Sequence, residues 1–481
     1  MTVLTRPGAA SRLRRGPLLA VLLTGQAMAS MDGSIVSVSA QAVREQLGAG
    51  GAEIQLIVSG YLLTTGVLLI TCARLGDVLG HRRVFLLGLG WFTAASLLCG
   101  LAPTAGALVA ARVAQAVGAA LLVPQVFSLI QVHWDGAARR TAIGLYSMVL
   151  ALGVALGQVV GGLAVGADLL GLGWRPAFLI NVPIGALLLA AAPRVLAAAP
   201  ASASVSGTGR ERPRLDLPGV ALLTVAMTAF TAPLIFGPDA GWPPAAWISL
   251  AGGATLLAGF VLLEKRLGER GRQPLLDLAV VRPAGVRTGL AACWIIMGCY
   301  TAFLLTLTLH LQSALRFSAL EAGLAFVPYA LGFGALSLTW GRVPGRLRNA
   351  LPVAGPIAFA AGAGTLVLLA RDVWPGAVSV PLLLLAGAGH AAGYAPLIAR
   401  VSSLVEARLA GALSALNSTG PMLAGVIGVA ALGSVYFAAP ESGEGLRRVT
   451  AVMSLVLVTG AGCALRAMLA ARTAANSADH R

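Results

Sequence analysis

The stretch ARLGDVLGHRRVFLLG, residues 73–88, places a short charged turn between two long apolar runs. Gly76 and Gly80 permit a tight turn and a close approach of the flanking segments. The stretch has a second copy, because GRVPGRLR at residues 341–348 matches GDVLGHRR at residues 76–83 in its glycines, its valine and its last arginine. Arg342 stands in the second copy where Asp77 stands in the first. The chain therefore contains an internal repeat.

Apolar runs continue on both sides of these two turns. Of the 481 residues, 57% are hydrophobic and 11% are charged, whereas charged residues make up about a quarter of a soluble domain. Runs of about 20 apolar residues are long enough to cross a bilayer as helices. We therefore predict an all-α membrane protein with fourteen transmembrane helices, at residues 16–38, 54–73, 84–102, 105–131, 141–165, 176–197, 217–237, 245–264, 287–311, 320–340, 351–370, 379–400, 409–437 and 449–471.

The repeated turns divide these helices into two halves, since each turn follows the second helix of a set of six. Two six-helix repeats are the usual plan of a secondary transporter. We predict an N-terminal six-helix bundle at residues 1–198 and a C-terminal six-helix bundle at residues 285–481. Between them, residues 199–284 form a flexible linker, rich in Ala, Ser, Gly and Arg, and two inserted helices.

The net charge of +16 does not indicate a nucleic-acid partner, because the basic residues form no single patch. They lie in short clusters between the apolar runs, mostly in alternate loops on one side of the predicted helices. An excess of Lys and Arg marks the cytoplasmic loops of a membrane protein. The distribution predicts a multi-pass protein of the plasma membrane, surrounded by lipid, with both termini in the cytoplasm.

Asp32, in GQAMASMDGSIVSVSA at residues 25–40, is the only acidic residue that falls neither in a loop nor at the end of a predicted span. A charge at mid-membrane costs about 2.5–3.5 kcal/mol on insertion scales. Asp32 lies roughly 24 Å along the first span, and Arg112 lies roughly 10 Å along the fourth, which runs in the opposite direction. The two residues are therefore expected at a similar depth, where they can pair. Asp32 either carries a proton or forms a static structural ion pair with Arg112.

Other polar and aromatic side chains inside the spans are candidates for a substrate cavity. Lipid offers polar side chains no hydrogen-bond partner, so they are expected to face the protein interior. His390 can titrate near neutral pH or simply bond to a backbone carbonyl. For each aromatic residue, packing is an alternative to ligand contact. The cavity candidates are Tyr61, Gln115, Gln125, Tyr146, Trp294, Tyr300, Tyr329, His390 and Asn417.

The turn at residues 73–88 resembles the signature G-x-L-x-D-x-x-G-[RK]-[RK], which joins the second and third helices in the major facilitator superfamily. In that family this turn latches the two halves of the protein on the cytoplasmic side. The resemblance assigns a conformational latch to Gly76, Asp77, Gly80, Arg82 and Arg83. Asp77 lies near the C-terminal end of a helix, where the helix dipole disfavours an anion. We expect Arg82, Arg83 or a neighbouring helix N-terminus to pair with it.

Further stretches are similar to the fourteen-helix drug:proton antiporter branch of this superfamily. MDGSIVSVSAQAV at residues 31–43 resembles its first-helix signature and carries Asp32, and ARVAQAVGAALLVPQ at residues 111–125 carries Arg112 and Gln115. WRPAFLINVPIG at residues 174–185 resembles the entry to its sixth helix. ALGVALGQVVGG at residues 151–162 resembles its fifth-helix antiporter signature, at Gly153, Gly157, Gln158, Gly161 and Gly162, with Gln158 in place of a proline.

The resemblance implies proton-coupled export of hydrophobic small molecules, such as drugs or antibiotics, by alternating access. The alternative is a dedicated exporter of one endogenous metabolite or self-made antibiotic. A single membrane acid favours neutral or anionic substrates over cations. A membrane-embedded enzyme or a channel is not indicated, since the sequence clusters no catalytic side chains. Neither a cofactor nor a metal is expected, and the five cysteines show no ligand-like spacing.

Overall fold

The structure is a computed structural model that describes residues 9–167, 171–197, 217–237, 240–270, 274–275, 277–370, 373–406 and 409–479. Every regular element in these ranges is helical. The expected linker at residues 198–216 lies outside the described residues. The elements are α1 (Ala9–Leu47), α2 (Gly51–Leu79), α3 (His81–Gly100), α4 (Ala105–His133), α5 (Gly136–Gly166), α6 (Pro176–Leu179), α7 (Asn181–Ala197), α8 (Leu217–Phe236), α9 (Pro244–Glu269), η2 (Leu278–Val281), α10 (Val286–Ser313), α11 (Ala319–Ala325), α12 (Val327–Thr339), η3 (Trp340–Arg342), α13 (Gly345–Leu369), η4 (Gly376–Val378), α14 (Ser379–Leu404), α15 (Ala410–Phe437) and α16 (Ser442–Asp479).

These helices agree with the predicted spans in order and in approximate position. Within the described residues, 13 helical segments are long and apolar enough to cross a membrane. The remaining predicted span corresponds to α5, which has 31 residues and contributes a shorter apolar helix at Leu156–Gly166. The helices extend beyond the predicted apolar runs at several ends, because polar residues continue the helical backbone outside the apolar core.

Two predicted spans each consist of two helices. The span at 176–197 divides into α6 and α7, and the span at 320–340 divides into α11 and α12. Proline explains both interruptions, because Pro183 and Pro328 lack the N–H that would continue the helical hydrogen bonds into the preceding turn. α11 begins with a capping box, in which the Ser318 N–H donates to Glu321 at 2.8 Å and the Glu321 N–H donates to the Ser318 hydroxyl at 3.2 Å.

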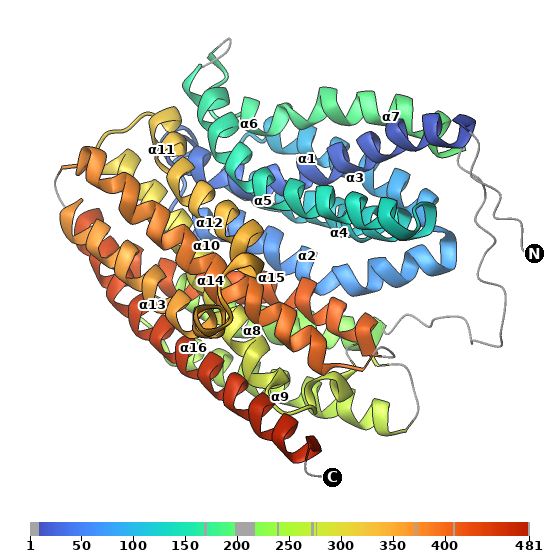
Figure 1. Cartoon of the computed structure of the whole chain (residues 1–481). Coiled ribbons are helices and arrows are strands. Elements are labelled where there is room, and N and C mark those ends of the chain that lie inside the picture. Colours follow the sequence, from blue (N-terminus) through green and yellow to red (C-terminus); the bar gives the residue numbers. More distant parts are fainter. Residues whose placement is uncertain are drawn as a thin grey trace, which may run out of the picture.

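The helices pack as two groups that follow the chain. α1 to α7 pack on one another, with α1 against α5 and α4 against both α2 and α3. α10 to α16 form the second group, in which α14 lies between α12 and α13, and α16 packs on α10 and α13. The groups meet where α2 contacts α15, α5 contacts α11 and α1 contacts α10. Figure 1 shows the two groups approaching each other near α6 and α11 and diverging toward the side of the chain termini.

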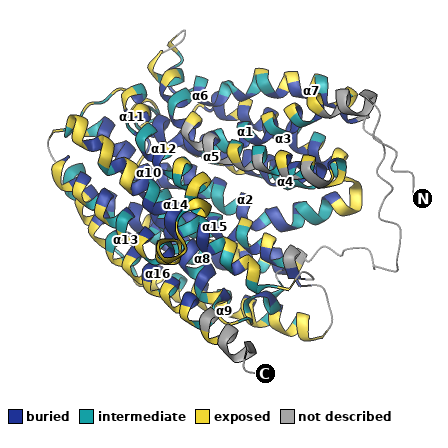
Figure 2. Ribbon diagram, in the orientation of Figure 1, coloured by how far each residue is buried: buried dark blue, intermediate teal, exposed yellow. Residues whose placement is uncertain are grey.

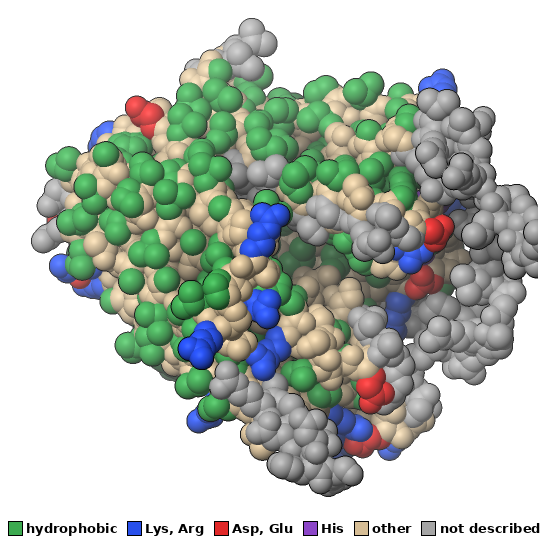
Figure 3. Space-filling view, viewed as in Figure 1, with side chains coloured by type: hydrophobic (Ala, Val, Ile, Leu, Met, Phe, Trp, Pro, Cys, Tyr) green, Lys and Arg blue, Asp and Glu red, His purple; other side chains and the backbone are tan. Residues whose placement is uncertain are grey.

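α8 and α9 form a pair at the edge of this arrangement. They pack on each other, and α8 also contacts α2 and α15, so it bridges the two groups. Figure 2 shows that buried residues line the faces on which helices pack, while exposed residues lie on the outer faces. Hydrophobic side chains cover much of the surface in Figure 3. On α9, for example, Trp247 and Ile248 are exposed. An apolar outer surface is the arrangement that a lipid environment requires.

Candidate functional site

A buried polar network in the first helix group contains the two membrane charges. Asp32 on α1 and Arg112 on α4 are each 1% exposed. Arg112 Nη1 donates to Asp32 Oδ2 at 2.5 Å, so the ion pair expected from their similar depth is formed. The helices that carry the two residues run in opposite directions and pack on each other.

Two amide side chains complete the hydrogen bonds of the carboxylate. Gln115, one turn beyond Arg112 on α4, donates to Asp32 Oδ1 at 2.7 Å and to Ser96 on α3 at 2.8 Å. Its own oxygen accepts a hydrogen bond from Arg112 Nη1 at 2.6 Å. Asn181, the first residue of α7, donates to Asp32 Oδ1 at 3.0 Å. Helices α1, α3, α4 and α7 therefore meet at this one carboxylate.

The guanidinium of Arg112 is held by aromatic rings as well as by Asp32. Its central carbon lies 4.1 Å from the ring centroid of Tyr61 on α2 and 5.6 Å from that of Phe178 on α6. Its Nε donates to the carbonyl of Ile57 at 3.3 Å. Cation–π contacts strengthen when the cation is desolvated, and a buried ion pair is tolerated only when further hydrogen bonds satisfy both groups. This environment satisfies both conditions.

Asn181 and Ser96 belong to the network but were not among the residues singled out from the sequence. Asn181 lies within the stretch at 174–185 that resembles the entry to the sixth helix. Its position is set by the interruption between α6 and α7, which a continuous predicted span does not reveal. A polar residue two positions before a proline, inside an apolar run, was the available signal for it.

The glycines of α5 pack against α1 beside Asp32. A side chain at Gly153 would meet Ser30, one at Gly157 would meet Met31 and Ser34, and one at Gly161 would meet Ile35. Gly162 faces the second helix group instead, at Ala319 and Leu320. These residues form a helix-packing face of the kind that small residues create in membranes.

Gln158 also faces α1 and donates to the carbonyl of Ser34 at 3.0 Å. α5 is continuous through this residue. Gln158 joins α5 to the helix that carries Asp32.

The latch residues lie where α2 turns into α3. Gly80 has a φ of +91°, a conformation that favours glycine. Asp77 pairs with His81 at 3.4 Å, whereas Arg82 donates to the carbonyl of Pro193 at 3.2 Å. Of the expected alternatives, the described residues form no pair of Asp77 with Arg82 or Arg83. The partner is His81, which is the first residue of the neighbouring helix α3.

Gln125 belongs to this turn and not to the Asp32 network. Its side chain contacts His81 Nδ1 at 2.8 Å and donates to the carbonyl of Cys72 at 2.8 Å. It also occupies the space that a side chain at Gly76 would need. Gly76 therefore allows α2 and α4 to approach closely at the latch.

The remaining cavity candidates lie apart from Asp32. In the second helix group, Tyr300 stacks on Tyr329 with ring centroids 5.6 Å apart, and Tyr329 hydrogen-bonds to His390 at 2.8 Å. Asn417 accepts a hydrogen bond from Tyr394 at 3.2 Å. Two candidates are separate from this cluster: Trp294 packs against Gly420, and Tyr146 packs against Phe127 in the first group.

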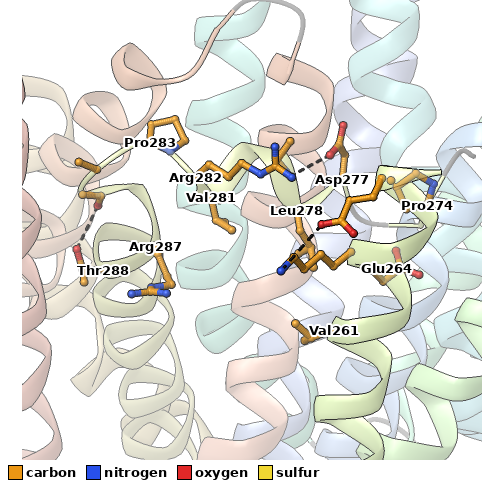
Figure 4. A pocket seen from close by; sticks show the side chains of 16 residues that line it. Val261, Glu264, Pro274, Asp277, Leu278, Val281, Arg282, Pro283, Arg287 and Thr288 are labelled. Atoms are coloured by element: carbon orange, nitrogen blue, oxygen red, sulfur yellow. Dashed lines mark hydrogen bonds and ion pairs between the residues drawn. The ribbon is translucent and has the colours of Figure 1, made fainter. Parts of the chain in front are cut away.

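A cavity of about 910 Å³ lies where α9, η2 and the start of α10 meet (Figure 4). Its lining includes Glu264, Lys265, Asp277 and Arg282, and it contains none of the predicted site residues. Glu264 is 1% exposed, so a second acidic side chain is buried, at the end of a predicted span. α9 continues beyond it to Glu269. The described residues contain no group of three or more His, Cys, Asp or Glu side chains able to hold a metal ion.

Comparison with known proteins places these features in a family. Residues 22–429 match the family model described as Major Facilitator Superfamily. The chain is 35% identical over 438 residues to a probable actinorhodin transporter of Streptomyces coelicolor, which covers 90% of this chain and 74% of that protein. It is 35% identical over 425 residues to the cephamycin export protein CmcT of Amycolatopsis lactamdurans, which covers 86% of this chain and 83% of that protein.

The fold has a counterpart among solved structures. A bacterial homologue of the human lysosomal transporter Spinster superposes with a TM-score of 0.67 at 16% sequence identity, covering 95% of this chain and 97% of that one. The helical architecture and the family match thus agree, and they indicate a transporter rather than an enzyme. The chain is a multi-pass membrane protein that belongs to the Major Facilitator Superfamily.

Proposed function

We propose that this protein exports hydrophobic small molecules, such as drugs or antibiotics, in exchange for protons. The observation that carries the proposal is the Asp32 network, a buried carboxylate held by Arg112, Gln115 and Asn181. Such a group is costly inside a membrane and marks a functional site. The names of the relatives, an actinorhodin transporter and a cephamycin export protein, support export as the direction of transport.

The network suggests how proton binding drives movement. Protonation of Asp32 removes the negative charge that faces Arg112 and leaves the guanidinium with Tyr61, Gln115 Oε1 and the Ile57 carbonyl. The attraction between α1 and α4 weakens, and an equilibrium between two conformations shifts by the difference in proton affinity between them. Return of Asp32 to its charged form restores the bridge.

The arrangement of the chain in the membrane is part of the proposal. Both termini lie in the cytoplasm of a cell whose plasma membrane holds the protein, and residues 1–198 and 285–481 act as the two moving bundles. The latch at Gly76, Asp77, Gly80, Arg82 and Arg83 then lies on the cytoplasmic side. Arg74, just before it, donates to the Pro274 carbonyl at 2.5 Å and so ties α2 to the segment that follows α9.

Substrates are neutral or anionic in this proposal. The carboxylate of Asp32 is fully engaged by three donors and has no free oxygen to offer a cationic drug. A second candidate function is export of a single antibiotic, which the relatives named for individual compounds favour. Transport of a panel of compounds distinguishes the two, since a dedicated exporter moves one chemical class only.

A vesicle assay tests proton coupling directly. Everted membrane vesicles containing the full chain are energised, and substrate uptake and proton release are followed together. Asp32→Asn is expected to abolish proton-driven uptake, because the amide binds no proton. Asp135→Asn is the matched control, since Asp135 is exposed and pairs with Arg139 one turn away, and it is expected to behave as wild type. Full proton-driven uptake by Asp32→Asn would refute the coupling role.

A further inference from the structure

The second helix group contains an imidazole enclosed by aromatic rings. His390 on α14 is 3% exposed. Its ring centroid lies 4.7 Å from that of Phe333, 4.9 Å from Tyr300, 6.0 Å from Phe359 and 6.3 Å from Tyr394. These rings come from α10, α12, α13 and α14. The enclosure gives flat, polarisable walls, which suit an aromatic ligand.

The hydrogen bonds of His390 are incomplete. Nδ1 lies 2.8 Å from the Tyr329 hydroxyl. Among the residues that the structure describes, the buried Nε2 atom has no hydrogen-bond partner. An unsatisfied buried polar atom costs free energy. A ligand that forms a hydrogen bond with Nε2 would remove this cost.

The tautomer of His390 follows from the number of polar atoms that each tautomer leaves without a hydrogen bond. If the Tyr329 hydroxyl donates to Nδ1, both of these atoms are satisfied, and the proton of the neutral ring lies on Nε2. If Nδ1 donates instead, the Tyr329 hydroxyl proton has no acceptor within the described structure, and Nε2 is an unmet acceptor as well. The first arrangement leaves one unsatisfied group and the second leaves two. Nε2 is therefore assigned as an N–H donor that needs an acceptor.

Three of the rings around His390 are only partly buried, those of Tyr300, Phe333 and Tyr394. The acceptor has to reach the imidazole past them. The five rings around His390, those of Tyr300, Tyr329, Phe333, Phe359 and Tyr394, carry no ionised group at neutral pH. A cationic ligand would thus find no counter-charge at this place.

We propose that His390 is the polar anchor of a substrate subsite in the second helix group, which binds planar aromatic compounds through a ring carbonyl oxygen. The ligand inserts its ring among Tyr300, Phe333 and Tyr394 and accepts a hydrogen bond from Nε2 of His390. The subsite deepens the proposed export function by naming a substrate class. It lies in the half of the molecule opposite the Asp32 network, so one half senses the proton and the other recognises the substrate.

Equilibrium binding with a pair of ligands tests this subsite. The full chain in lipid nanodiscs is dialysed against anthraquinone-2-sulfonate and against anthracene-2-sulfonate, which differ in the two ring carbonyls. Wild type is expected to bind the quinone about tenfold more tightly, the size expected for one hydrogen bond to a buried donor. In His390→Phe, which keeps an aromatic ring but lacks the donor, the ratio of the two dissociation constants is expected to fall to about one.

Two further variants separate recognition from packing. His390→Gln keeps an N–H donor and is expected to retain part of the preference. Tyr300→Leu removes a wall and is expected to weaken both ligands equally while the ratio is preserved. If His390→Phe does not fold, His390→Leu replaces it as the variant without a donor.

An unchanged ratio in folded His390→Phe overturns the proposal, and so does a wild-type protein that binds neither ligand or shows no carbonyl preference. The binding assay uses no proton gradient. Loss of coupling and loss of carbonyl recognition are therefore scored separately, and either proposal can fail without the other.

Discussion

At the scale of single residues, the Asp32 carboxylate is satisfied in its charged form. It accepts hydrogen bonds from Arg112, Gln115 and Asn181 and is closed to the outside. In the proposed mechanism, proton uptake requires a different arrangement of these helices, in which at least one donor has moved away. The proposal thus gives the same carboxylate two roles, a structural partner in this arrangement and a proton acceptor in the other.

Part of this site was predictable from the sequence, and the reason lies in residue type. Asp32 and Arg112 stand out because charges are rare inside apolar runs, and antiparallel helices of known length place them at one depth. The partners of shorter polar residues depend on tertiary contacts. Nothing in the sequence shows that Asn181 meets Asp32, that His81 and not Arg82 pairs with Asp77, or that Gln125 lies at the latch.

Removal of one donor tests the network at this scale. Asn181→Leu keeps a similar side-chain volume but deprives Asp32 Oδ1 of its hydrogen bond at 3.0 Å. The free energy of unfolding is expected to fall by about 1.5–3 kcal/mol, the usual contribution of a hydrogen bond to a charged group. Thermal unfolding of the purified protein in detergent measures this change. Asn349→Leu, at the exposed start of α13, serves as the control, and equal stability of the two variants would contradict the assignment.

At the scale of elements, the glycines of α5 allow this helix to pack closely against α1. Gly153, Gly157 and Gly161 recur every four residues and present one smooth face to the turns of α1 that flank Asp32. Their spacing was readable from the sequence, and small residues at this spacing predict a packing face. The identity of the partner helix was not, since several helices of the bundle could have supplied it. The contact of Gln158 with the Ser34 carbonyl likewise depends on the packed arrangement.

A single methyl group tests this packing face. In Gly157→Ala the new side chain would collide with the Met31 carbonyl and the Ser34 hydroxyl. We expect α5 to be forced away from α1, with a loss of about 1–3 kcal/mol of stability, as is typical of overpacking, and with weaker proton-coupled transport. The matched control is Gly166→Ala in the same helix, where the nearest atom to the new carbon is 3.7 Å away. If both variants unfold at the wild-type temperature, the close contact of α5 and α1 is not required.

At the scale of the whole molecule, the two halves share a plan but differ in chemistry. The turns at 76–83 and 341–348 both join the second and third spans of their halves, as the repeat predicts. The first half holds the buried ion pair, and the second holds the aromatic cluster around His390. The sequence predicted the repeat because spacing and hydropathy persist in both copies. The aromatic cluster was only partly foreseen, because residues from four helices have to fold together to form it.

Alternating access requires the contact between α5 and α11 to open and close, and a reversible cross-link tests this. A Cβ built at Gly166 lies 3.7 Å from Cβ of Leu320, close to the mean separation of about 3.8 Å in disulfides. The double variant Gly166→Cys, Leu320→Cys is expected to form a disulfide under mild oxidation that joins the two helix groups. Transport in vesicles is expected to stop on oxidation and to return after a reductant is added. The single variants are the controls and are expected to remain active in oxidant, since four of the five native cysteines are buried. Undiminished transport by a fully cross-linked protein would show that α5 and α11 stay together throughout the cycle, and that the two groups move elsewhere.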